Sequence, residues 1–580
     1  MLKNKKERII TVIKRLFLQE EKWIRTMMAI QVILMYYWIA KYLMQTDSIY
    51  TIYLIWGVLG FVGLSHNTKI QIKSHLLILT GVSFVFSGTV VLSNYYLFST
   101  SQQILMMLLS GTLVSFHAFK FLYLKLMNAY WNESNLSGKI KPWIIFLLAL
   151  VVIASIDFFY LFECDYPGNL SSDSIDQIGQ IMRGQYSNHH PFWHTMIIKA
   201  CISLGLQLFG EINAAVAVYS VFQIIFMSAC FAYAIVTVFQ QKISLKIILL
   251  GVMWYAFMPY HIVYSTTMWK DIIFAGAVLL FTTSLYRIWY EVGKCKILNW
   301  SNLFLGGLLF ALLRSNGRIA VILTLVGMVI IFRAKYKIIY CIMISVILIA
   351  YILNGPILTK LDVTKPSIQE SLSIPLQQIA RVVVDEGELT EEQCMRIDNI
   401  LDIEKIKEVY HPSVSDPIKA LLDRDSFSED VVANMQLWLE LGIQHPGSYI
   451  KAWVDQTKGY WNGGYIYTVY YHWIYENDFG IVRSVKNDYA MNIMVGIADI
   501  VAANPFYGIL RGIGINAWAI FGLALLNYFK GSKRKAFLSF PVMGIVATLL
   551  IATPLFSEFR YAYSIFTCIP FLTLITFTKE

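Results

Sequence analysis

Charged residues are scarce in this 580-residue chain, because Asp, Glu, Lys and Arg together make up 14% of it. Ordinary soluble domains are about one quarter charged. Hydrophobic residues reach 57%, and apolar runs of membrane-spanning length, about 17 to 25 residues, recur along most of the sequence. The scarcity of charge excludes an ordinary soluble domain. The sequence therefore predicts an all-α polytopic membrane protein, with no nucleic-acid partner.

Paired cysteines are also lacking. The chain has seven cysteines but no CxxC motif, which gives neither a disulfide framework nor a structural zinc site. There is no internal repeat of fixed period and no low-complexity tract. The organisation of the chain has to be inferred from the apolar runs and from the charges between them.

The basic residues predict the topology, because Lys and Arg concentrate in cytoplasmic loops. A basic leader, residues 1–22, precedes the first apolar run at 23–44. The run 192–209 carries His, Lys, Ser and Gln, and it is predicted to lie in the outer interface. With that placement the short basic loops all fall on the cytoplasmic side of the membrane. The pattern predicts about 14 membrane helices and cytoplasmic N- and C-termini.

Acidic residues gather in one late segment. Residues 354–500 hold 22 Asp and Glu but 12 Lys and Arg, a net charge of −10, whereas the whole chain carries +10. This segment lacks long apolar runs, so 354–504 is predicted to be an inserted, mainly helical extracytoplasmic domain. The other predicted parts are N-terminal transmembrane helices (23–163), an outer catalytic loop with interfacial helices (164–211), core transmembrane helices (212–353) and C-terminal transmembrane helices (505–580).

The stretch SSDSIDQIGQIMRGQYSNHHPFWHT, residues 171–195, is the part of the sequence that most resembles a reactive site. A serine at its start is predicted to cap a short amphipathic helix that Gly184 ends. Asp173 and Asp176 lie three residues apart on the polar face of this helix. Either both suit the positive end of the helix dipole and face water, or one of them is a general base at the bilayer surface.

Three histidines follow this helix: His189, His190 and His194. His190 and His194 have the i, i+4 spacing of a metal pair, but Pro191 lies between them and no third ligand is evident. Hydrogen bonding to substrate or ordering of the loop is therefore the favoured role.

Further charged residues are predicted to lie at the outer rim of the membrane. Charges that enter apolar runs are costly, and they are usually functional or paired. Cations at this rim could hold a donor phosphate. The alternative is a mutual or interfacial pair for Lys270 and Asp271, and a simple pair for Glu558 and Arg560. For Arg314 and Arg318 the alternative is snorkelling to lipid headgroups. The residues concerned are Lys270, Asp271, Arg314, Arg318, Glu558 and Arg560.

An aromatic run, residues 458–478, lies late in the predicted outer domain. Its Trp461 and Trp473 could stack on the C–H faces of sugars and hold a glycan. The alternative is an aromatic belt at the membrane interface.

Several of these motifs resemble a bacterial multi-pass membrane family of the GT-C glycosyltransferase type. The order of an acid, a glycine, a His-Pro motif and a helix ending in LFG is distantly similar to protein mannosyltransferases and aminoarabinose transferases. Their HPPL-like motif corresponds here to HPFW, which lacks the second proline and the leucine. The segments that carry the family resemblance are YPGNLSSDSIDQ (166–177), HHPFWHT (189–195), MWKDIIFA (268–275), LLRSNGR (312–318), SIPLQQIARVV (373–383) and SEFRYAYS (557–564).

The resemblance implies a GT-C-like fold in the bacterial plasma membrane and an inverting transfer on its outer face. The implied donor is a sugar on polyprenyl phosphate, the acceptor is an envelope glycan or another molecule, and membrane lipids are partners. The general base falls on Asp173, with Asp176 as the alternative. No cofactor is certain, and a divalent cation, Mg²⁺ or Mn²⁺, is left open.

Two other functions remain open at this point. A transporter or flippase of a lipid-linked glycan would be expected to place polar or broken helices at the bilayer midplane. A polymerase or ligase of surface polysaccharide would use the same kind of lipid-linked glycan. The gathering of charge at the outer rim favours the glycosyltransferase.

Overall fold

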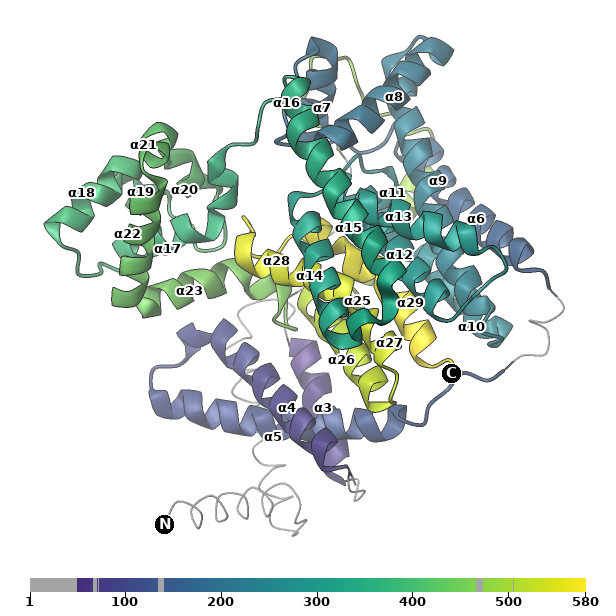
Figure 1. The fold of residues 1–580 in the computed structure, drawn as a ribbon, viewed down its shortest axis with the longest axis horizontal. Coiled ribbons are helices and arrows are strands. Elements are labelled where there is room, and N and C mark those ends of the chain that lie inside the picture. The colour runs from purple at the N-terminus through teal and green to yellow at the C-terminus, as the bar shows by residue number, and fades with distance from the viewer. Residues whose placement is uncertain are drawn as a thin grey trace.

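The computed structural model describes residues 50–65, 70, 72–133, 140–465, 473–503 and 505–579. Regular structure in these residues is helical, and β-structure within them is limited to isolated bridges. The predicted all-α fold is confirmed for this part of the chain (Figure 1). The basic leader 1–22 and the first predicted membrane helix, 23–44, lie outside the described residues.

Nine helical stretches within the described ranges are long and apolar enough to cross a membrane. A tenth is added if the bent pair α10 (Leu245–Phe257) and α11 (Pro259–Thr266) counts as one span. One of the nine contains two helices packed side by side, α14 (Ser315–Phe332) and α15 (Lys337–Ile352). These helices support a membrane protein, whereas the predicted total of about 14 spans stays a prediction.

The stretch 192–209 is helix α8 (Phe192–Phe209), and it passes the same test of length and hydropathy. Gly210 ends it in a left-handed conformation, with φ of +69°. The chain then turns into α9 (Ile212–Phe239), which packs against α8. The predicted placement of this stretch in the outer interface stays a prediction.

The main body is built around one central helix, α12 (Lys270–Trp289). Nearly every residue of α12 is buried, because it packs against neighbours on several sides. Those neighbours are α9, α13 (Lys296–Leu312) and α29 (Tyr563–Thr576), and around them lie α6 (Pro142–Phe159), α26 (Ile513–Phe529) and α28 (Phe540–Ala552). The first residue of the central helix is Lys270, so the packing of the body fixes where this charge lies.

Three N-terminal helices form a group below the main body in Figure 1. They are α3 (Tyr50–Ser65), α4 (Lys73–Ser93) and α5 (Ser101–Leu126), and both α3 and α4 pack on α5. A cavity of about 330 Å³, lined mainly by apolar side chains, lies between this group and α26, and Phe86 contacts Trp518 beside it, with ring centroids 5.0 Å apart.

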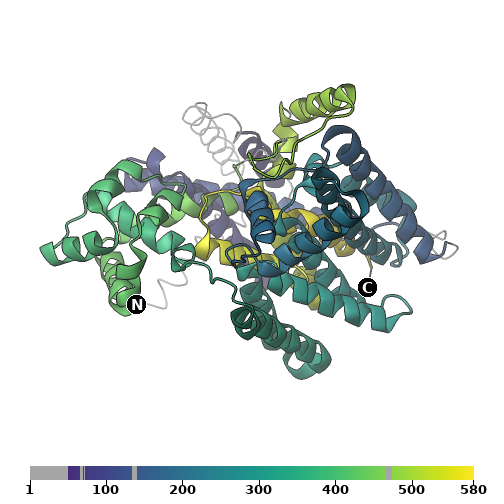
Figure 2. The same cartoon turned by 90° about the horizontal axis from the view of Figure 1, so that it is seen from above.

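The segment predicted as an inserted domain contains a helical lobe with a hydrophobic core of its own. The lobe stands to one side of the main body in both views (Figures 1 and 2). The Tyr95 hydroxyl of the N-terminal group donates to Asp455 of the lobe at 2.8 Å. The placement of this lobe outside the membrane stays a prediction. The helices of the lobe are α17 (Ser373–Val384), α18 (Glu391–Ile400), α19 (Ile403–Val409), α20 (Asp416–Leu421), α21 (Arg424–Glu429), α22 (Val431–Gln444) and α23 (Pro446–Thr457).

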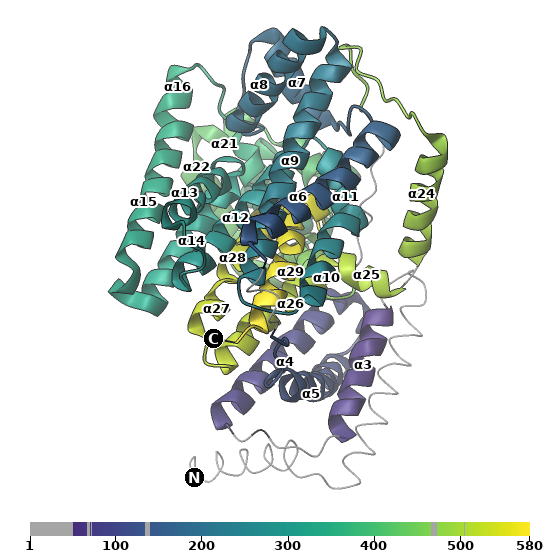
Figure 3. The same cartoon turned by 90° about the vertical axis from the view of Figure 1, so that its right-hand side faces the viewer.

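Short elements connect these bodies. After the lobe the chain returns along one side of the body through α24 (Asp488–Ala503), as Figure 3 shows. The other short elements are η1 (Tyr95–Leu97), η3 (Tyr160–Cys164), η4 (Arg333–Tyr336), η5 (Leu353–Ile357), α16 (Leu358–Lys360), η6 (Ile368–Ser371), η7 (Lys458–Tyr460), α25 (Pro505–Arg511), α27 (Lys533–Phe537) and η8 (Phe559–Ala562).

A buried network fixes the loop between α6 and α7 (Ser172–Arg183) to the body. The fully buried carboxylate of Asp165 accepts hydrogen bonds from the Asn169 amide at 2.6 Å and the Thr266 hydroxyl at 2.9 Å. Arg483 pairs with the same carboxylate at 3.1 Å. A buried carboxylate needs such partners, because an unpaired charge is expensive to remove from water. The network therefore determines where α7 starts.

We predict that Gly168→Ala destabilises this loop by about 1–3 kcal/mol, because Gly168 has φ of +125°. A Cβ at this position would also lie 2.5 Å from Ser220 Oγ and 2.6 Å from the Thr266 carbonyl oxygen. The midpoint of thermal unfolding in detergent measures the effect. Gly447→Ala is the control, since a Cβ there meets nothing within 4 Å. Equal midpoints for the two variants would contradict the account of the loop.

Candidate functional site

Helix α7 begins and ends where the sequence predicts. The backbone N–H of Ser171 donates to Ser174 Oγ at 3.1 Å, and that hydroxyl donates to the Met268 carbonyl at 2.7 Å. Gly184 ends the helix in a left-handed conformation, with φ of +67°. The predicted amphipathic helix with its glycine end is confirmed, and its first turn is tied to the segment before α12.

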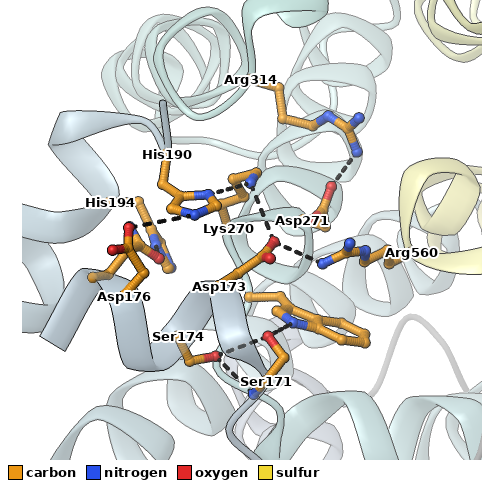
Figure 4. Close-up of polar contacts among 12 residues, drawn as sticks. Ser171, Asp173, Ser174, Asp176, His190, His194, Lys270, Asp271, Arg314 and Arg560 are labelled. Atoms are coloured by element: carbon orange, nitrogen blue, oxygen red, sulfur yellow. Dashed lines mark hydrogen bonds and ion pairs between the residues drawn. The ribbon is translucent and has the colours of Figure 1, made fainter. Parts of the chain in front are cut away.

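The first turn of α12 is held against the first turn of α7. The Gln223 side-chain amide donates to the carbonyls of Tyr264, Ser265 and Thr267, which fixes the turn between α11 and α12. The Trp269 indole N–H then donates to Ser171 Oγ at 2.6 Å. The starts of the two helices therefore face each other, as Figure 4 shows.

Asp173 lies at the centre of this arrangement, between two cations (Figure 4). Its Oδ2 is 2.9 Å from Arg560 Nη1 and 3.7 Å from Lys270 Nζ, and 26% of its side chain is exposed. Burial alone would raise the pKa of the Asp173 carboxyl. Lys270 and Arg560 outweigh burial and hold that pKa well below its usual range. Asp173 is therefore a carboxylate at neutral pH.

His190 connects Lys270 to the second acid of α7. Lys270 Nζ is 3.1 Å from His190 Nδ1, and His190 Nε2 is 3.7 Å from Asp176 Oδ2. Burial, followed by the charge of Lys270, lowers the pKa of His190 to about 3, so its ring is neutral at pH 7. A neutral ring accepts from the ammonium at Nδ1 and carries its proton at Nε2, toward Asp176. Asp176 also accepts from the Gln180 amide at 2.8 Å.

The charges of Asp271 and Arg314 are matched to each other. Asp271 is fully buried, and its Oδ1 pairs with Arg314 Nη1. The Arg314 guanidinium packs over the ring of Tyr561, 4.6 Å from its centroid. Arg314, predicted to hold a donor phosphate, is thus engaged by a buried acid. This ion pair with Asp271 is neither of the two roles that the sequence predicts for Arg314, phosphate binding and snorkelling.

Arg560 has an aromatic neighbour that sequence analysis missed. Its guanidinium carbon lies 4.7 Å from the centroid of the Trp269 ring. Trp269 thus contacts both Arg560 and the N-cap of α7. Its place directly before the Lys-Asp pair could have drawn attention to it. Glu558 is buried, and its Oε1 lies 3.9 Å from Arg560 Nε.

Three other predicted site residues lie apart from the pair of Asp173 and Lys270. His194 is buried, and its ring nitrogens lie 3.1 Å from Gln177 Oε1 and 2.7 Å from the Tyr219 hydroxyl. These contacts give it a role in ordering the loop. His189 is exposed, and its ring is 4.7 Å from that of His190. Arg318 makes no hydrogen bond or ion pair with any residue that the structure describes.

The aromatic run does not form one continuous platform in its described part. Trp461 is 9% exposed and stacks on Trp453, with ring centroids 5.8 Å apart. Its face is therefore not open to a glycan, which corrects the prediction for this residue. Trp473 is 47% exposed, so a glycan contact there stays a prediction. Residues 466–472 lie outside the described part of the chain.

Within the described residues, no group of three or more His, Cys, Asp or Glu side chains could hold a metal ion. The carboxylate of Asp173 already faces two cations, and Asp176 faces His190 and Gln180. These donor atoms do not fit a divalent cation, because the neighbouring ammonium and guanidinium groups would repel it. The possible divalent cation, Mg²⁺ or Mn²⁺, therefore stays a prediction.

A sequence model of one known family matches residues 182–580, well over half of the chain. The chain belongs to this family. It is described as a family of unknown function (DUF6020). Lys270, Arg314 and Arg560 lie within the matched residues, whereas Asp173 and Asp176 lie just before them. No curated protein and no solved structure matches the chain.

We predict that Asp271→Asn lowers the stability of the protein by about 3 kcal/mol, because it leaves the largely buried Arg314 without its counter-charge. Asp176→Asn is the comparison, since its side chain is 47% exposed and should change stability little. The free energy of unfolding in detergent distinguishes the two. The double variant Asp271→Asn with Arg314→Gln should recover part of the loss. Unchanged stability in Asp271→Asn would show that the pair is not structural.

Proposed function

We propose that this protein is an inverting membrane glycosyltransferase that takes its sugar from polyprenyl phosphate and uses Asp173 as the general base. One observation carries the proposal. A carboxylate and two cations, Lys270 and Arg560, are held together at the start of a helix long and apolar enough to cross a membrane. Transfer of a sugar from a lipid phosphate to a hydroxyl group needs both kinds of group: cations for the phosphate and a carboxylate for the proton of the hydroxyl.

The reaction that fits these groups is a single displacement. The acceptor hydroxyl oxygen bonds to the anomeric carbon while the bond from that carbon to the phosphate oxygen breaks. The hydroxyl proton passes to the Asp173 carboxylate, and the electron pair of the broken bond stays on the phosphate. One displacement inverts the anomeric carbon. The leaving phosphate gains negative charge, which cations stabilise without a protonating acid.

The geometry also explains how a carboxylate with a low pKa could act as a base. Paired with Lys270 and Arg560, Asp173 is a weak base, because both cations favour its ionised form. A donor phosphate that binds the same two cations would share their charge. The pKa of Asp173 would then rise toward its usual range, where it accepts a proton more readily. Donor binding would in this way prepare the base.

The neutral ring of His190 has a positioning role in this scheme. It accepts from the Lys270 ammonium at 3.1 Å and so fixes the direction in which that side chain extends. Asp176, on the other side of the ring, is 47% exposed and lies farther from the cations. This arrangement favours Asp173 over Asp176 as the base.

A transporter or flippase of a lipid-linked glycan is the second candidate, because one helix is broken. Helices α10 and α11 are bent by 50° at Met258. Broken helices form substrate sites in many transporters. Here, however, the short helix leads into the turn that positions Trp269 and Lys270, so the break also serves the proposed site. The same site could serve a polymerase or ligase of surface polysaccharide.

We predict that Asp173→Asn lowers turnover by about 10²-fold or more, because the amide keeps the size of the side chain but cannot accept the proton. Asp176→Asn, the matched control, should stay within about tenfold of the unchanged protein. The measurement is transfer of label from a panel of radiolabelled polyprenyl-phosphate sugars in proteoliposomes that contain envelope glycan.

The two variants together separate the outcomes. Loss of transfer in Asp176→Asn alone would move the base to Asp176. Normal transfer in both variants would refute the general-base mechanism. Movement of the labelled lipid across the bilayer without transfer of its sugar would instead support the flippase.

A further inference from the structure

The loop that leads from α28 to Arg560, residues 553–558, forms a small antiparallel bridge with the helical lobe. The lobe contributes residues 411–415 to this bridge, and Figure 1 shows α28 at the edge of the body that faces the lobe. Val414 and Leu555 face each other, flanked by two backbone hydrogen bonds that are both 2.9 Å long. The lobe is thus joined to the body a few residues before a cation of the proposed site.

The last helix of the lobe, α23, and the turn after it hold the same loop. The Gln456 side-chain amide donates to the Thr553 carbonyl at 2.7 Å, and the Gly459 backbone N–H donates to the Phe556 carbonyl at 3.1 Å. The approach at Gly459 is so close that a Cβ there would lie 2.4 Å from the Phe556 carbonyl oxygen. Two separate segments of the chain in and beside the lobe therefore fix the course of this loop.

Gln377 holds the lobe's half of the bridge from inside the lobe. This residue lies on α17, in the segment SIPLQQIARVV, and its side chain is fully buried. Its Nε2 donates to the carbonyls of His411 and Val414, both at 2.8 Å. These carbonyls belong to the turn that faces Leu555 across the bridge. One buried side chain therefore fixes the shape of the turn that contacts the loop before Arg560.

Gln378, the next residue of α17, forms its hydrogen bonds within the lobe. Its Nε2 donates to the Tyr449 carbonyl at 3.4 Å, and its Oε1 accepts from the Trp438 indole N–H at 2.8 Å. Gln378 is also buried. The two glutamines share their residue type, their helix and their burial, but Gln377 alone of the two bonds the bridging turn. They therefore offer a matched comparison.

Arg560 is the residue through which a shift of the loop would reach the proposed site. It lies in η8 (Phe559–Ala562), which directly follows the loop. Its guanidinium is 2.9 Å from Asp173 and packs 4.7 Å from the centroid of the Trp269 ring. Hydrogen bonds weaken steeply when they are misaligned, and a displacement of about 1 Å can cost about 10²-fold in rate. The position of this loop therefore matters for a phosphate bound at Arg560.

We propose that the lobe positions Arg560 for the donor phosphate, and that Gln377 is the positioning residue that transmits this control. The contacts run from Gln377 to residues 411–415, across the bridge to residues 553–558, and along the chain to Arg560. Gln377 acts through Arg560 and is not itself a catalytic residue. The part of this proposal that concerns the donor rests on the proposed function, whereas the positioning of Arg560 does not.

Amide hydrogen exchange of the full-length protein in detergent, read by mass spectrometry, tests the positioning without any substrate. Gln377→Met keeps the length of the side chain but cannot donate a hydrogen bond. We predict that peptides covering residues 553–562 exchange roughly tenfold faster in this variant, the loss expected for one or two buried hydrogen bonds. In the matched Gln378→Met variant these peptides should exchange as in the unchanged protein.

Binding of polyprenyl phosphate, measured by isothermal titration calorimetry, tests the consequence for the donor. Gln377→Met should weaken binding roughly tenfold, the loss expected for a hydrogen bond to a charged group, and Gln378→Met should bind normally. Gln456→Met breaks a different hydrogen bond between the lobe and the loop, so it should resemble Gln377→Met in both measurements. It is the deciding variant if thermal unfolding shows that Gln377→Met does not fold.

A reversible cross-link tests whether the bridge itself carries the effect. Facing residues flanked in this way have Cα atoms about 4.5 Å apart, a distance that a disulfide can span. We expect Val414→Cys with Leu555→Cys, added to Gln377→Met, to restore slow exchange and donor affinity when oxidised. Reduction of the disulfide should remove both again.

The outcomes are distinguishable. Unchanged exchange of residues 553–562 in Gln377→Met, or equally fast exchange in the Gln378→Met variant, would overturn the positioning role, because the second result indicates a general loosening of the lobe. Fast exchange with unchanged donor affinity would overturn the control of donor binding. If the unchanged protein binds no polyprenyl phosphate, the proposed function fails, and the exchange result still decides whether the lobe positions Arg560.

Discussion

The carboxylate of Asp173 holds two like charges together, and the geometry of the proposed site depends on it. Lys270 and Arg560 belong to different helical segments, and without an acid between them they would repel each other in a poorly solvated place. The rest of the local structure fixes that acid. Trp269 joins the starts of α7 and α12, and Gln223 holds the turn before α12. A substrate phosphate that binds Lys270 and Arg560 would therefore also weaken their ion pairs with Asp173.

Because an unpaired charge is costly to bury, the neighbouring charged residues have different roles. Asp271 and Arg314 are buried and matched, so their pair contributes to the stability of the body rather than to binding. Asp173 is one quarter exposed and is shared by two cations, so a ligand can reach it and redistribute the charge. The exposure of the acid thus distinguishes the buried structural pair from the site that a ligand can reach.

Part of this arrangement could be predicted from the sequence. Helix α7 follows from its capping serine, its amphipathic spacing and Gly184, all of which are local features. That Lys270 and Arg560 lie near Asp173 follows from charge at the ends of apolar runs. The pairing of Arg314 with an acid could not be predicted, because it depends on how packed helices are rotated about their axes.

The aromatic residues show the same limit. The burial of Trp461 depends on its contact with Trp453 in the preceding helix, which no local pattern reveals. The most direct test is a cryo-EM structure with polyprenyl phosphate bound. The account predicts phosphate oxygens in hydrogen-bond contact with Lys270 and Arg560, and an Arg560–Asp173 separation longer than the present 2.9 Å. Phosphate bound elsewhere, with that ion pair unchanged, would contradict it.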